Sequence, residues 1–121
     1  MKPKKLGSFI VDVYDFKIAL FMGLPEDMKP NTAAYAEWYT NTKTVNIYLK
    51  EDYWTGNLMH ECIHAADFIL NGIGADMGTN PNDSEVRAYL ATYIFGKCGC
   101  LLGTTKEKKK VRNSNAYMVP K

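Results

Sequence analysis

The chain has 121 residues, of which 46% are hydrophobic and 23% charged, and its formal net charge is +2. This composition is typical of one globular domain. Three cysteines, an odd number, argue against a disulfide-stabilised secreted domain. Asp12, Asp15 and Lys17 interrupt the first apolar stretch, so we expect no signal peptide, and no run is long enough to span a membrane. We therefore expect a cytoplasmic protein.

Four β-strands are predicted in the first part of the chain. Segments rich in β-branched and aromatic residues occur at residues 8–13, 16–21, 34–40 and 44–50. Short polar segments, at Tyr14-Asp15 and at Asn41-Thr42-Lys43, separate the members of each pair and predict two hairpins. Segment 24–31, which contains two prolines, is expected to be a loop.

A helix is predicted next. Apolar residues with helical spacing are Leu58, Ile63, Ala66, Ile69 and Leu70. Asn71 and Gly72 are expected to end this helix, and either Thr55 or Asp52 to cap its start.

The predicted helix contains the pattern His60-Glu61-x-x-His64, which uses both histidines of the chain. Residues four apart on a helix have Cβ atoms about 5–6 Å apart. Two imidazoles at that spacing can bind one Zn²⁺ at about 2.0–2.1 Å each. Glu61 can then stand beside the metal as a general base, whereas Cys62 faces about 160° away and is expected to be buried. The alternative is an ordinary amphipathic helix whose histidines bind no metal.

A hydrolytic zinc site needs a third protein ligand and an open position. Because no histidine remains, the ligand must be a carboxylate or a thiolate. The metzincin pattern is excluded, since it requires glycine and histidine where this chain has Asp67 and Leu70. Asp67 shares the histidine face, and it is either a second-shell partner of His64 or a solvated residue. The carboxylates that remain as third-ligand candidates are Asp67, Asp76, Asp83 and Glu85.

A second helix is predicted over residues 82–95, with Asn82 or Asp83 as N-cap and Pro81 just before it. Its expected apolar positions are Val86, Tyr89, Leu90, Tyr93 and Ile94. Cys98-Gly99-Cys100 is interpreted as a helix end with small buried residues, with a redox or metal site as the alternative.

This succession of helices resembles the gluzincin group of zinc metallopeptidases, and more closely the small zincin-like proteins encoded by tailed phages and prophages. Segments 60–65 and 82–90 carry the resemblance, which covers residues 35–96. It implies that Glu85, twenty-one residues after His64, is the third zinc ligand. One departure is Tyr89, which stands where many gluzincins carry an aspartate that supports a histidine.

Together these features predict an α+β fold: a minimal zincin-like domain over residues 1–103, with a small sheet beside the motif helix and a second ligand-bearing helix. Residues 104–121 are expected to form a basic, flexible tail. Between Leu6 and Gly103, twelve acidic residues outnumber six basic ones. Basic charge is thus concentrated at the ends of the chain. A solvated tail is expected, with contact to nucleic acid or to an acidic partner as the alternative, and no membrane partner is expected.

The expected function is a peptidase with one Zn²⁺ per chain, in which Glu61 takes the proton of a zinc-activated water that attacks a peptide carbonyl. A second oxyanion donor is expected from the tyrosines Tyr53, Tyr89, Tyr93 and Tyr117. The edge of the strand at residues 44–50 is expected to bind an extended peptide. The alternative is a zincin-fold zinc-binding module that inhibits a host factor or builds a virion without turnover.

Overall fold

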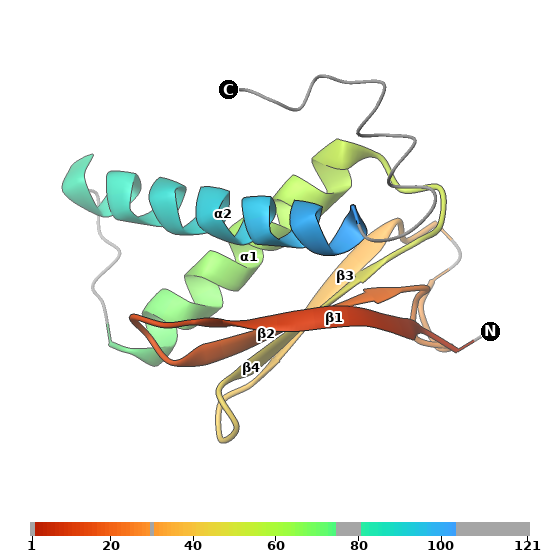
Figure 1. Ribbon diagram of the computed structural model, residues 1–121, viewed down its shortest axis with the longest axis horizontal. Helices are drawn as coiled ribbons and strands as arrows, with labels where there is room; N and C mark the ends of the chain where they lie inside the picture. The colour runs from red at the N-terminus through yellow and green to blue at the C-terminus, as the bar shows by residue number, and fades with distance from the viewer. Residues whose placement is uncertain (1, 30, 75–80, 104–121) are drawn as a thin grey trace.

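The computed structural model describes residues 2–29, 31–74 and 81–103, with the backbone alone for residues 81–83. Four strands precede two helices (Figure 1), which confirms the predicted α+β class and the order of its elements. The elements are β1 (Lys4–Val11), β2 (Phe16–Met22), β3 (Ala34–Tyr39), β4 (Thr44–Leu49), α1 (Thr55–Gly72) and α2 (Pro81–Leu102). The predicted tail lies outside the described residues. Within the described part of the chain, neither helix is long and apolar enough to cross a membrane.

The strands form one mixed sheet in the order β1-β2-β4-β3. Both predicted hairpins are confirmed, because β1 pairs antiparallel with β2 and β3 pairs antiparallel with β4. A parallel pairing of β2 with β4, in which Leu20 lies opposite Ile47, joins the two hairpins. The prediction that the strand at 44–50 offers a free edge is therefore wrong, because β4 has a partner on each side. The edges are β1 and β3.

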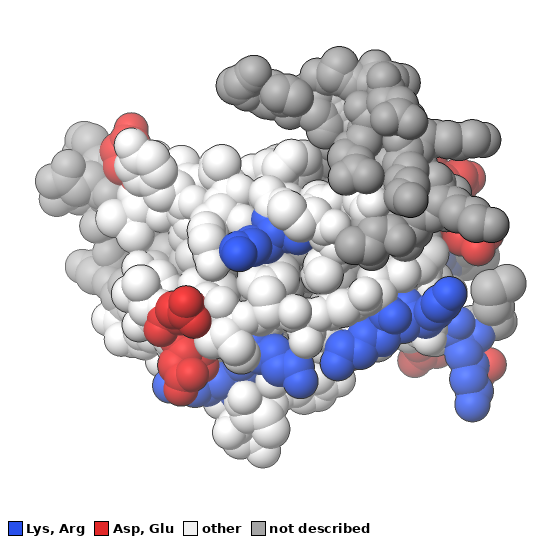
Figure 2. Space-filling view, viewed as in Figure 1, with Lys and Arg blue, Asp and Glu red and all other residues white. Residues whose placement is uncertain are grey.

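The two edge strands differ in charge. On β1, Lys4 and Lys5 are exposed, and the register shifts between Lys5 and Gly7. Lysines and bulges at an edge discourage pairing with another chain. Figure 2 shows Lys and Arg side chains along the lower border of one face, over β1 and β2. β3 has no lysine and carries the exposed side chains of Trp38 and Tyr39, so it is the edge more open to an added strand.

Both helices pack on the same face of the sheet (Figure 1), α1 over β3 and β4 and α2 over β1. Alternate residues of each strand point to this face, as the pleat of a strand requires. The fully buried side chains of this core include Ile18, Leu20, Val45, Ile47, Leu49, Ile69, Leu70 and Ile94. The packing places α1 between the edge strand β3 on one side and α2 on the other.

The opposite face of the sheet carries a row of aromatic rings. Tyr48 stacks on Phe21 of β2, with ring centroids 4.8 Å apart, and on Tyr35 of β3, at 6.2 Å. These three residues are paired across the register of the three strands. Because the rings stack on one another, they shield one another on this side of the sheet, while α1 and α2 pack on the other side.

One hydrogen-bond network lies beside this row. The Tyr48 hydroxyl donates to Glu37 Oε2 at 2.6 Å, and Asn46 Nδ2 donates to the same oxygen at 3.4 Å. Burial alone would raise the pKa of Glu37, but hydrogen bonds from Tyr48, Tyr39 and Asn46 outweigh it and lower that pKa below its ordinary value of 4.5. Burial and the same carboxylate raise the pKa of Tyr48.

The start of α1 differs from the prediction. Trp54 is the N-cap, so neither Thr55 nor Asp52 holds that position. The Asn57 side chain instead closes the first turn, because its Oδ1 accepts from the Trp54 backbone N–H at 2.8 Å. This is the reciprocal half of a capping box, in which the third helical residue satisfies the cap backbone. The helix ends at Gly72, as predicted.

The start of α2 also differs. The helix begins at Pro81, so Asn82 and Asp83 lie inside its first turn and do not cap it. Proline is favoured at the first helical position because it has no N–H to leave unpaired. The residue before Pro81 lies outside the described part of the chain.

The buried face of α2 is only partly the predicted one. Leu90 and Ile94 are buried, but Val86, Tyr89 and Tyr93 are exposed, Tyr89 by 74%. The residues that α2 buries are Leu90, Ala91, Ile94, Cys98 and Leu102. Two of these are small, which allows α2 to approach α1 closely, and a search for large apolar residues at helical spacing overlooks them.

Candidate metal centre

His60 and His64 meet on the exposed face of α1. Their Nε2 atoms lie 3.1 Å apart, with ring centroids at 4.7 Å and an interplanar angle of 78°. Two tetrahedral zinc ligands with bonds of about 2.0–2.1 Å have donor atoms about 3.3 Å apart. The spacing of the two imidazoles is therefore close to that of a pair sharing one ion, and the donor set suits Zn²⁺.

Glu61 lies between the histidine face and the core. It is 8% exposed, whereas both histidines are exposed. Burial raises the pKa of the Glu61 carboxyl above its ordinary value of 4.5, and the nearby His60 and His64 offset only part of that rise. A carboxylate in such surroundings accepts a proton more readily than one in water.

The predicted third ligand is not at the histidine pair. Glu85 lies on the exposed side of α2, near its start. Among the described side chains, no group of three or more His, Cys, Asp or Glu is close enough to hold a metal ion. The structure thus brings His60 and His64 together but does not bring Glu85 to them. Of the alternatives, Asp76 and the side chain of Asp83 lie outside the described residues.

Asp67 contacts α2. Arg87 Nε donates to Asp67 Oδ1 at 2.7 Å, and Arg87 Nη2 donates to Oδ2 at 3.1 Å. Asp67 follows His64 by three residues and Arg87 follows Glu85 by two, so the ion pair ties the turn that carries Glu85 to the turn after His64. Sequence reasoning overlooked Arg87, although it is the only basic residue between Lys50 and Lys97.

An aromatic shelf, formed by Trp38 and Phe68, borders the histidines on the β3 side. The two rings stack with centroids 3.6 Å apart, and the Phe68 ring is nearly parallel to that of His64 at 6.1 Å. Trp38 is nevertheless 49% exposed. The alternation of β3, which points Trp38 to the same face as buried Ala36, was the sequence signal for this shelf.

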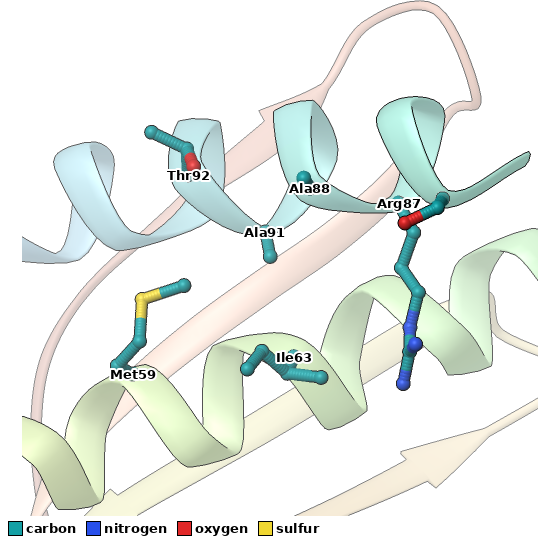
Figure 3. Close-up of a pocket in the computed structure, with 7 residues that line it drawn as sticks. Met59, Ile63, Arg87, Ala88, Ala91 and Thr92 are labelled. Atoms are coloured by element: carbon teal, nitrogen blue, oxygen red, sulfur yellow. The ribbon is translucent and has the colours of Figure 1, made fainter. Parts of the chain in front are cut away.

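A groove separates the two helices on the other side of the histidines (Figure 3). Its volume is about 260 Å³. The residues that line it are Met59, Ile63, Ser84, Arg87, Ala88, Ala91 and Thr92. Met59 and Ile63 immediately precede His60 and His64, so the α1 wall of the groove adjoins the histidine pair.

The cysteines do not join this site. Cys62 is fully buried, as predicted, and lies against buried Cys98 of α2. This contact and burial raise the pKa of the Cys62 thiol. Cys100 is exposed, so the predicted burial of the Cys98-Gly99-Cys100 segment holds for Cys98 alone. All three cysteines are free thiols.

The candidate oxyanion tyrosines lie in different surroundings. Tyr53 is half-buried against the core, and Tyr89 is exposed on α2. Tyr93 packs edge-on against Phe9 of β1. Tyr117 lies outside the described residues. No family model, curated protein or solved structure matches this chain.

Proposed function

We propose that the chain is a zinc-dependent peptidase in which His60 and His64 hold the metal and Glu61 is the general base. The observation that supports this proposal most is the 3.1 Å separation of the two histidine Nε2 atoms on an open face. A buried carboxylate follows the first histidine directly. An ordinary amphipathic helix has no need of a buried carboxylate directly beside two histidines that meet on its exposed face.

We assign Glu85 as the third ligand within this proposal. In the structure Glu85 is not at the histidine pair, so this assignment requires a shift at the start of α2, which the Arg87–Asp67 ion pair keeps next to the turn of α1 that follows His64. Glu85 and the two histidines are all exposed, so each is accessible to an ion from solvent. Aspartate or glutamate is a usual third ligand beside two histidines in catalytic zinc sites.

Each residue then has a defined role in hydrolysis. His60, His64 and Glu85 would hold the Zn²⁺, which when bound would supply Lewis acidity to the substrate carbonyl and to a water molecule. Glu61 accepts the proton from the attacking water as its oxygen bonds to the carbonyl carbon. Glu61 then donates this proton to the amide nitrogen as the carbon–nitrogen bond breaks. The exposed Tyr89 on α2 remains a candidate donor to the developing oxyanion.

The edge of β3 supports a peptide substrate. It has no lysine, and its exposed Trp38 stacks on Phe68, whose ring is nearly parallel to that of His64. An extended peptide that pairs with this edge would gain main-chain hydrogen bonds and pass beside the histidines. The peptide-binding edge predicted for β4 is thereby reassigned to β3.

The test is Glu61→Gln, which keeps the shape of the side chain but removes its ability to take a proton. Zinc content should stay at about one per chain, while hydrolysis of a peptide library should fall by at least about a hundredfold, as loss of a general base predicts. Glu51→Gln, the same change at an exposed turn residue, is the matched control and should hydrolyse normally. Hydrolysis retained by Glu61→Gln would contradict the mechanism.

A second function, a binding module without turnover, is favoured by one observation. Val86, Tyr89 and Tyr93 are exposed along the outer side of α2 at helical spacing, and such apolar rows often contact a partner. A zinc-loaded wild-type protein that hydrolyses no peptide in the library would favour this function over the peptidase.

A further inference from the structure

We infer that two copies of this chain pair through the face formed by the outer side of α2 and the edge strand β1, related by a two-fold axis across that face. The inference goes beyond the proposed hydrolysis and does not depend on it, because the histidine pair is not part of this face. It assigns Tyr89 to the contact between the two copies and not to the oxyanion.

The outer side of α2 and the edge of β1 form one continuous surface. Tyr93 packs edge-on against Phe9 of β1, with ring centroids 6.5 Å apart. Towards the end of α2, the Leu101 side chain lies against Gly7, because a Cβ added at Gly7 would meet it. α2 therefore runs antiparallel to β1, as Figure 1 shows. The end of β1 lies beside the start of α2, and the start of β1 lies beside the end of α2.

Large apolar side chains are exposed at one end of this surface. Val86 is 44% exposed and Tyr89 74% exposed on the first half of α2, and Val13, in the turn after β1, is 85% exposed. Tyr93, which is 42% exposed, continues the row towards the middle of the helix. Figure 2 shows a largely uncharged area over α2 on this side of the molecule. Burial of this apolar surface against a partner is a source of affinity.

The second half of α2 offers space for such side chains. A Cβ added at Gly96 or at Gly99 would meet no atom within 4 Å, and both glycines are exposed. A two-fold axis across the face sets the two α2 helices antiparallel, so the large side chains on the first half of one helix face the glycines of the other. A closed dimer requires a surface that is complementary to itself in this way.

Charge complementarity favours a second copy as the partner. Lys4 and Lys5 are exposed at the start of β1, and Asp12 and Asp15 are exposed just after its end. None of these four side chains forms an ion pair within the described part of the chain. The same two-fold axis brings the lysines of each copy to the aspartates of the other, so opposite charges meet at both ends of the contact. The lysines and the register shift of β1 discourage a continuous sheet, so the two β1 strands meet through their side chains.

Sedimentation equilibrium of the full chain, with and without zinc, tests the inference. The wild-type protein should have twice the mass of one chain in both conditions. Tyr89→Asp places a charge inside the contact and should raise the dissociation constant of the dimer at least about a hundredfold. Trp54→Asp is the matched control, because Trp54 is 73% exposed at the start of α1, and it should leave the dissociation constant unchanged. Circular dichroism checks that both variants are folded.

Lys4→Glu and Asp12→Lys test the two-fold arrangement. Each variant alone brings like charges together at both ends of the contact and should weaken self-association about tenfold. An equal mixture of the two variants should recover the wild-type affinity, because each copy then presents charges opposite to those of the other. Failure of the mixture to associate more tightly than either variant alone would overturn the two-fold arrangement.

A wild-type protein that stays monomeric would overturn the inference and leave the apolar row of α2 to a different partner. Dimers that form only with zinc would also overturn it, because an exposed histidine pair can share an ion between two chains. Equal self-association of wild type and Tyr89→Asp would place the contact on another face. None of these results bears on hydrolysis, which Glu61→Gln tests separately.

Discussion

Arg87 and Asp67 join α2 to α1 through two parallel hydrogen bonds, of 2.7 and 3.1 Å. This is the bidentate geometry, with two parallel N–H···O bonds, that a guanidinium and a carboxylate often adopt. Asp67 lies on the histidine face of α1, where the sequence suggested a partner for His64. Its two oxygens accept from Arg87 instead, so this residue contributes to the position of α2.

Arg87→Ala should lower the free energy of unfolding by up to about 1 kcal/mol, because both partners are partly exposed and solvent weakens the pair. It should also weaken zinc binding by about tenfold, since the turn that carries Glu85 is no longer held against α1. Urea unfolding and competition with a zinc chelator measure the two effects. The swapped pair Asp67→Arg with Arg87→Asp should recover both. Unchanged zinc affinity in Arg87→Ala would limit the ion pair to a stabilising role.

Glu85→Ala should weaken zinc binding at least tenfold, by the loss of one of three protein ligands. Glu26→Ala, an exposed loop substitution, is the control for the change in net charge. Elemental analysis of protein dialysed against a chelator gives the zinc content of each variant. An unchanged content in Glu85→Ala would move the third ligand to Asp67, Asp76 or Asp83.

Trp38→Ala should raise KM for peptide hydrolysis about tenfold, equivalent to about 1.4 kcal/mol, with a much smaller effect on kcat. The physical reason is loss of the aromatic shelf beside the edge of β3, on which a peptide side chain can stack. Trp54→Ala is the matched control, because Trp54 is 73% exposed at the start of α1. Steady-state kinetics check both variants, and equal effects of the two substitutions would remove Trp38 from the substrate site.

Tyr48→Phe should reduce stability by about 1 kcal/mol at pH 7, since it removes the hydroxyl that donates to the Glu37 carboxylate. The folded pKa of Glu37 lies below 4.5, so its stabilisation is complete above that pH and is lost as the pH falls through the folded value. The difference between wild type and variant should therefore shrink at low pH.

Urea unfolding at pH 7 and at about pH 3 measures this change. Tyr35→Phe is the control, because the Tyr35 ring also stacks on Tyr48 but its hydroxyl is not among the groups that hydrogen-bond to Glu37. A difference between wild type and Tyr48→Phe that does not depend on pH would contradict the assigned role of Glu37.

Local pattern predicted the strands well and their arrangement only in part. Alternating apolar residues and short polar turns located all four strands to within a few residues, because these signals come from neighbours in the chain. The parallel pairing of β2 with β4 has no local signal. It depends on how the two hairpins pack together. Because of this pairing, the strand at residues 44–50, which was expected at an edge, is an inner strand of the sheet.

At the candidate site, too, features within one element could be predicted from the sequence, and contacts between elements could not. His60, Glu61 and His64 belong to one helix, so their spacing could be predicted from the helical repeat alone. The Trp38–Phe68 stack and the Arg87–Asp67 pair each join two elements and could not be predicted in this way. Tyr89 and Tyr93 were wrongly assigned to the buried face of α2 because they are larger than Ala91 and Cys98, which pack inwards together with the correctly predicted Leu90 and Ile94.

The parallel pairing at the centre of the sheet also bears on the order of folding. Pairing β2 with β4 requires closure of the chain between Met22 and Thr44, whereas each hairpin closes a short turn. Long-range closure has the larger entropic cost and slows folding. We expect the hairpins to form first and to dock through β2 and β4 later. The α1 helix follows the second hairpin in the chain and packs on β3 and β4. The histidine pair on α1 therefore belongs to a unit, β3-β4-α1, whose elements are consecutive in the chain and can assemble before the two hairpins dock.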